Sequence, residues 1–243
     1  MTTPALAENV RGKGRHYKHP TTGELVPSVT NVIGILDKPA LPRWSAKMVA
    51  ETAYRMRHAL PEMDESEAVD MLKGSPWSKS KRAADRGTDI HGYLEARLNS
   101  WEPEELSDEA EQYRAAADDW LGQDIEVVAT EQTMFHPYYA GTCDLVARID
   151  GVLTVADFKT GKAIYDEAAL QMAALFGCHH DQHGDPLAWR DAEGEMTEMP
   201  QLMAIRIGTD RFETKTVADP LASLRAFHAL REAWEWKNTK AYL

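Results

Sequence analysis

The chain has 243 residues, and its 43% hydrophobic and 27% charged residues are ordinary for a soluble globular protein with a substantial core. No apolar run approaches the roughly 18 residues of a membrane span, and the N-terminus lacks the apolar block of a signal peptide, so we expect no membrane partner. The net charge of −12 argues against a nucleic-acid partner, but residues 1–60 carry nine Lys/Arg against four Asp/Glu and remain available for phosphates.

Along the first half of the chain, the pattern predicts a small hairpin around residues 22–23 and then helices only. Ser107 is a plausible N-cap for the last of them. The helices are expected at residues 30–36, 42–59, 66–73, 77–98 and 107–121.

The pattern then changes to three successive strands at residues 125–136, 138–149 and 152–159, followed by a crossover helix at 166–177. Two further strands, at 202–208 and 212–217, precede a helix at 221–236. This order indicates an α/β fold with a mixed sheet flanked by helices. We expect one domain, with a mainly helical part over residues 1–122, an αβ core over 123–218 and a C-terminal helix over 219–243.

The dipeptide Asp150-Gly151 between apolar runs is a strong signal for a two-residue hairpin turn. With this turn, Asp144 faces Asp157 across the hairpin, and Lys159 shares their side of the sheet. Two facing carboxylates repel each other, whereas a divalent cation between them would reverse the sign of the interaction. The spacing therefore indicates a metal site with a lysine beside it. The alternative is that both aspartates lie at solvent-facing edges and Lys159 merely neutralises them.

His91 falls on the same helical face as the apolar Ile90 and Leu94. Alone, such a histidine is more often a core residue than a ligand, but the aspartate pair favours the ligand interpretation. Glu95, one turn later, is a candidate to orient the imidazole, or else a surface charge.

These residues form an ordered set of motifs: G-x-x-x-H-x-x-x-E on a helix, G-x-x-D, D-x-K-T-G-K after a hairpin, and a glutamine on the next helix. The set resembles the RecB-like branch of the PD-(D/E)XK nuclease superfamily, including small phage-encoded exonucleases. The resemblance covers about residues 86–176 and implies a restriction-endonuclease-like nuclease domain. In this chain the motif residues are Gly87, His91, Glu95, Gly141, Asp144, Asp157, Lys159 and Gln171.

The resemblance implies that Mg²⁺ or Mn²⁺ is bound by His91, Asp144, Asp157 and the backbone carbonyl of Phe158. Lys159 would orient the attacking water or stabilise charge on the scissile phosphate. Phosphodiester hydrolysis needs both a nucleophilic water and a cation near the phosphate. Glu131, on the preceding strand, either supports the metal or is structural.

Two departures from the family pattern stand out. Cys143 precedes Asp144, where the superfamily name expects proline. The Q-x-x-x-Y motif reads Gln171 to Leu175, so the role of the tyrosine is absent or passes to Phe176. Gln171 is a candidate to contact Lys159 or the DNA end, and Arg82, Arg86 and Lys162 are candidate phosphate contacts. Each of these four also fits an ordinary solvated position.

The two cysteines, Cys143 and Cys178, form no disulfide framework, which suggests a reducing, cytoplasmic setting. The histidine-rich stretch 178–185 could suggest zinc, but we predict a polar loop because no second ligand pair follows.

The resemblance favours a metal-dependent exonuclease acting on DNA ends in phage or bacterial recombination, repair or replication, with a single-strand-annealing or recombination protein as a possible partner. The alternatives are an endonuclease of the same chemistry and a catalytically silent DNA-binding or recombination-partner protein.

Overall fold

The computed structural model describes residues 7–183 and 199–239. The chain divides into two compact units, one formed by Met1–Ile35 with Asp89–Leu243 and the other by Leu36–Thr88. A single nuclease domain over residues 1–243 stays a prediction.

The larger unit contains a five-stranded mixed sheet in the order β4-β5-β6-β7-β8, in which only the β6–β7 pair is parallel. The predicted α/β class and the turn are confirmed. Asp150 and Gly151 both have positive φ, +49° and +79°, as a tight hairpin turn of this kind requires. The strands are β4 (Ile125–His136), β5 (Tyr139–Ile149), β6 (Val152–Lys159), β7 (Gln201–Ile207) and β8 (Phe212–Thr216).

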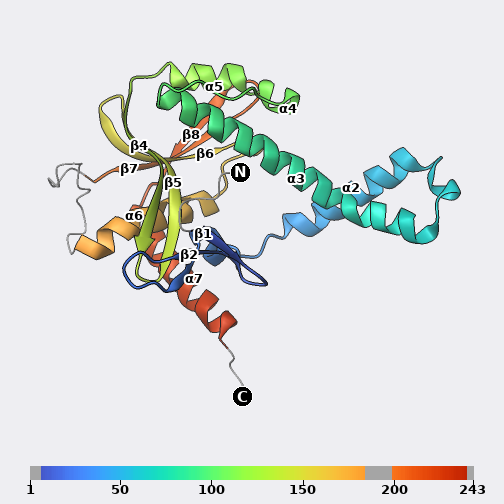
Figure 1. The fold of residues 1–243 in the computed structure, drawn as a ribbon, viewed down its shortest axis with the longest axis horizontal. Coiled ribbons are helices and arrows are strands. Elements are labelled where there is room, and N and C mark those ends of the chain that lie inside the picture. The colour runs from blue at the N-terminus through green and yellow to red at the C-terminus, as the bar shows by residue number, and fades with distance from the viewer. Residues whose placement is uncertain (1–6, 184–198, 240–243) are drawn as a thin grey trace. The chain divides into compact units, whose positions relative to one another are not determined.

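Helices cover both faces of this sheet (Figure 1). On one face, α4 (Asp108–Glu111), α5 (Arg114–Leu121) and the last turns of α3 (Glu65–Leu98) enclose the main core, in which Trp120 packs on Phe158. On the other face, α6 (Glu167–His183) packs on the strands and on α1 (Val29–Ile33) and α7 (Pro220–Asn238).

Gly141 is needed for this second layer. A Cβ at this position would lie 2.8 Å from Leu175 of α6 and 3.1 Å from Val29 of α1. The glycine of the G-x-x-D motif therefore allows close helix packing, and this need explains it without a role in chemistry.

A second, three-stranded antiparallel sheet precedes α1 in the chain, formed by β1 (Ala7–Val10), β2 (Gly14–Lys18) and β3 (Leu25–Pro27). The hairpin around residues 22–23 is confirmed as the β2–β3 connection. The sequence pattern does not predict β1. The part over residues 1–122, expected to be mainly helical, therefore contains a three-stranded sheet as well as helices. Tyr17 and Val26 pack on Ala140, which attaches this sheet to β5.

The smaller unit consists of α2 (Ala40–Met56), the 3₁₀ turn η1 (Leu60–Glu62) and α3 up to Thr88. The sequence predicts two helices, over 66–73 and 77–98, but α3 runs through Pro76 without a break. Pro76 has no N–H to donate to the Leu72 carbonyl, and the Ser75 hydroxyl donates to that oxygen instead, at 2.8 Å. The predicted break is therefore wrong because a neighbouring side chain replaces the lost backbone bond.

Cys143 and Cys178 are both buried and form no disulfide with each other. Residues 178–183 continue α6, so the predicted polar loop is wrong there. Residues 184–185 of that stretch lie outside the described residues. Within the described ranges, no helix is long and apolar enough to cross a membrane.

Candidate metal centre

The hairpin register places the two aspartates as predicted, at the point where strand pairing stops. Val146 lies opposite Val155, and the pairing of β5 with β6 ends at Leu145 and Ala156. Asp144 and Asp157 come next in the same register. Here the Phe158 N–H donates to Oδ2 of Asp144 at 2.7 Å, so a carboxylate satisfies a backbone donor.

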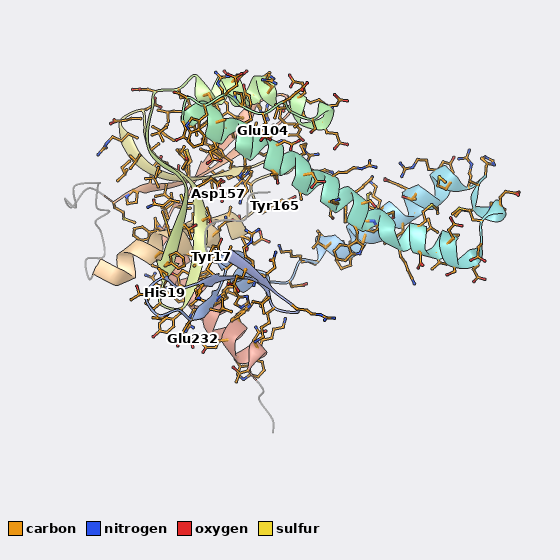
Figure 2. All side chains as sticks on the ribbon, viewed as in Figure 1. Tyr17, His19, Glu104, Asp157, Tyr165 and Glu232 are labelled. Atoms are coloured by element: carbon orange, nitrogen blue, oxygen red, sulfur yellow. The ribbon has the colours of Figure 1, made fainter. Side chains whose placement is uncertain are left out.

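Neither aspartate faces open solvent. Asp157, on the central sheet (Figure 2), is 2% exposed, and the Asp144 side chain is 11% exposed. The solvent-edge alternative is therefore wrong. Burial, followed by the nearby charge of Asp157, raises the pKa of Asp144 to about 7, so the repulsion expected between the two carboxylates is present.

Lys159 and Gln171 form a closed set of contacts with Asp157. Lys159 Nζ forms an ion pair with Asp157 Oδ2 and donates to Gln171 Oε1 at 3.0 Å, while Gln171 Nε2 donates to Asp157 Oδ1 at 2.6 Å. The predicted contact between Gln171 and Lys159 is confirmed. Gln171 therefore holds both the lysine and the carboxylate, and Lys159 neutralises Asp157 as the alternative interpretation supposed.

His91 reaches this cluster from α3. Its Nδ1 lies 3.4 Å from Oδ2 of Asp144, and its ring meets the Phe158 ring edge-on with centroids 5.9 Å apart. Ile90 and Leu94 are fully buried and fix the helix, whereas the His91 side chain remains 31% exposed. His91 is therefore at the boundary of the core, with a ring nitrogen directed at a carboxylate.

Glu131 lies in β4, between the pairs Thr130–Leu145 and Gln132–Cys143, which puts it opposite Asp144. Its φ is +47°, a left-handed conformation that is costly for a glutamate and tends to occur at functional sites. One ligand atom from each of His91, Glu131 and Asp144 lies within 4.8 Å of the other two. Partial burial, together with the charges of Glu95 and Asp157, raises the pKa of Glu131.

The remaining sequence candidates are less closely tied to this cluster. Within the described chain, Glu95 makes no hydrogen bond to His91, and its charge acts on Glu131 instead. Lys162 is exposed in the loop after β6. Arg82 and Arg86 lie on α3 in the smaller unit. The proposed DNA contacts of these three basic residues stay predictions. The role of the Phe158 carbonyl as a metal ligand also stays a prediction. Phe176 is buried, as is Leu175.

Two basic residues outside the predicted site hold the loop after Lys159. Arg206 Nε donates to the Gly161 carbonyl at 2.9 Å, and Lys215 Nζ donates to the Ile164 carbonyl at 3.1 Å. Arg206 also lies beside Lys159 in the parallel β6–β7 register. The alternating pattern of β7 could have indicated that Arg206 lies on one face of the sheet. Its hydrogen bond to the Gly161 carbonyl depends on the parallel pairing of β6 with β7, which the local sequence pattern does not predict.

Comparisons with known proteins add no family assignment. No protein-family model matches the chain, and no curated protein matches it. Among solved structures, the crystal structure of SSO0001 is similar over 63% of this chain and 75% of that chain, with 14% identity and a TM-score of 0.26. A likeness at this TM-score carries no argument about fold or function.

Proposed function

We propose that this protein is a divalent-metal-dependent deoxyribonuclease that hydrolyses phosphodiester bonds at DNA ends, built on a restriction-endonuclease-like fold. The observation that carries the proposal is the meeting of His91, Glu131 and Asp144 next to the Asp157–Lys159–Gln171 set. Such a cluster of acids, with one imidazole and one lysine, is unfavourable as a purely structural feature because the carboxylates repel each other.

The donor atoms suit a small divalent cation. Carboxylate oxygens are the ligands that Mg²⁺ and Mn²⁺ prefer, and an imidazole nitrogen favours Mn²⁺ over Mg²⁺. In the proposed site, His91, Glu131, Asp144, Asp157 and the Phe158 carbonyl hold the cation. A bound cation would lower the pKa of a coordinated water and stabilise charge on the phosphate.

Lys159 acts as a cation in this scheme. Burial alone would lower its pKa, but the charge of Asp157, the hydrogen bond to that carboxylate and the charge of Asp144 together raise the pKa above its ordinary value. A lysine that stays protonated at neutral pH cannot accept a proton from water. Its role is to orient the water and to stabilise negative charge on the phosphate, while Gln171 holds the ammonium in place.

The test is degradation of linear and covalently closed DNA of the same sequence, each with Mg²⁺, Mn²⁺ or EDTA. We expect loss of the linear DNA with either metal, no loss in EDTA and persistence of the closed circle. Cleavage of the closed circle would instead identify an endonuclease. No metal-dependent cleavage of either DNA, by protein that binds Mn²⁺, would overturn the proposal.

A further inference from the structure

Trp77 is the most exposed large apolar side chain of the described residues, with 79% of its surface accessible. It lies on α3 within the smaller unit, in a stretch, 77–85, that is exposed on every side of the helix. Within the described chain, no aromatic ring or cation lies against its indole. By contrast, Tyr54 of the same unit is covered by the guanidinium of Arg57 at 4.6 Å. Trp77 therefore presents an unused aromatic surface.

Two lysines flank this indole on the same side of α3. Lys73 and Lys81 are each four residues from Trp77, so the three side chains follow one another along one face of the helix. We name Lys73, Trp77 and Lys81 the α3 stripe. Lys79, two residues from Trp77, projects about 200° around the helix. It forms an ion pair with Glu51 of α2 at 3.5 Å, which places the stripe on the side of α3 that faces away from α2.

The charge of the smaller unit is opposite to that of the rest of the chain. Residues 36–88 carry ten Lys/Arg against eight Asp/Glu, a net charge of +2, although the whole chain has −12. Residues 71–88 alone carry five basic side chains against one acidic side chain. This basic stretch fits a polyanion such as a nucleic acid. An acidic protein, or the larger unit of a second copy of this chain, carries a lower density of negative charge than a phosphate backbone.

We propose that the α3 stripe binds single-stranded DNA, with Trp77 stacked on an unpaired base and Lys73 and Lys81 against the flanking phosphates. This inference rests on the proposed function for the choice of DNA as the polyanion. Base stacking on an exposed aromatic side chain, together with cations along the backbone, is the common mode of sequence-independent single-strand binding. Bases in a duplex are already stacked, so the stripe discriminates in favour of single strands.

The test is binding of a fluorescein-labelled oligo(dT) of about 20 nucleotides to the full chain in EDTA, followed by anisotropy. We expect Trp77→Ala to weaken binding by roughly 5- to 150-fold and Trp77→Phe to retain most of it. Lys73→Glu with Lys81→Glu should weaken binding and lower the salt slope by about 1.4, the value for two phosphate contacts on a single strand. The matched controls are Trp236→Ala and Lys237→Glu on α7, since Trp236 is also 72% exposed and both residues lie outside the stripe.

Equal oligo(dT) binding by Trp77→Ala and wild type overturns the inference. Failure of the wild-type protein to bind the single strand also overturns it, and would indicate a protein partner for this surface. Equal losses in Trp77→Ala and Trp236→Ala also overturn it. Failure of the proposed function is distinguishable, because binding in EDTA needs no cleavage. If wild type binds the single strand through the α3 stripe but never cleaves DNA, the binding inference stands and the proposed nuclease function is wrong. If wild type cleaves DNA but does not bind through the stripe, only the proposed nuclease function stands.

Discussion

Lys159 combines a structural contact with a proposed chemical role, and one substitution separates the two. Lys159→Ala should abolish DNA cleavage but leave Mn²⁺ binding, because the candidate ligands remain. It should also lower the melting temperature of the metal-free protein, since the buried carboxylate of Asp157 loses its cation. The measurements are degradation of linear DNA, calorimetric titration with Mn²⁺ and thermal melting in EDTA. Lys18→Ala, at an exposed position of β2, is the control. Near-normal turnover would remove Lys159 from the mechanism.

His91 tests whether the cluster binds metal through nitrogen as well as oxygen. His91→Ala should weaken Mn²⁺ binding by at least the roughly 10- to 100-fold that loss of an outer-shell contact causes, because His91 is proposed as a direct ligand. His91→Asp should shift preference toward Mg²⁺, since it replaces nitrogen by oxygen. Titration of each variant with both metals measures this. Wild-type Mn²⁺ affinity in His91→Ala would show that the imidazole only packs on Phe158 and faces Asp144 without binding metal.

At the scale of elements, the hairpin was the most predictable part of the fold. The β5–β6 register follows from one local signal, Asp150-Gly151, and this register brings Asp144 and Asp157 together. The approach of His91 to Asp144 and the left-handed conformation of Glu131 were harder to predict from the sequence. His91 reaches Asp144 only through packing of α3 on the sheet. The position of Glu131 depends on a register shift between Val127 and Ala129, for which the alternating pattern gives no sign.

The continuity of α3 leads to a test of how a helix passes through a proline. Ser75→Ala leaves the Leu72 carbonyl without its side-chain donor, so we expect a loss of about 1 kcal/mol in the stability of the smaller unit. Adding Pro76→Ala should recover it, because a backbone N–H becomes available. The matched control is Ser78→Ala, whose hydroxyl donates to the Gly74 carbonyl at 3.2 Å, an oxygen that the Ser78 N–H can also serve. Hydrogen exchange over residues 66–88 measures the effect, and equal protection in Ser75→Ala and Ser78→Ala would contradict it.

For the whole molecule, the candidate site makes stability depend on pH. The folded-state pKa of Asp144 is raised from 3.8 to about 7, so the native state binds more protons than the unfolded state between these values. The contribution of Asp144 to the free energy of unfolding is therefore largest below 3.8 and decreases as pH rises toward 7. His91, Glu131, Asp157 and Lys159 share the cluster and modulate the size of this effect. Asp144→Asn keeps an oxygen for the Phe158 N–H and should remove this component.

Urea unfolding of wild type and Asp144→Asn at pH 5 and pH 8, both in EDTA, measures the difference. We expect the variant to gain stability relative to wild type at pH 8 and much less at pH 5. Asp210→Asn, at an exposed turn position, controls for a general change of charge. A wild-type-like pH dependence in Asp144→Asn would mean that its carboxyl does not hold a proton in the native state.

The burial of both cysteines has a chemical consequence beyond folding. Cys143 is enclosed between strands, and burial raises the pKa of its thiol well above the ordinary value, so little reactive thiolate forms at neutral pH. Cys178 is likewise shielded on α6. The native protein should therefore react slowly with maleimides and offer a low background for labelling. A single thiol introduced by Trp77→Cys would then carry a dye or a photocrosslinker at one defined position, so that whatever molecule lies against α3 could be captured covalently and identified.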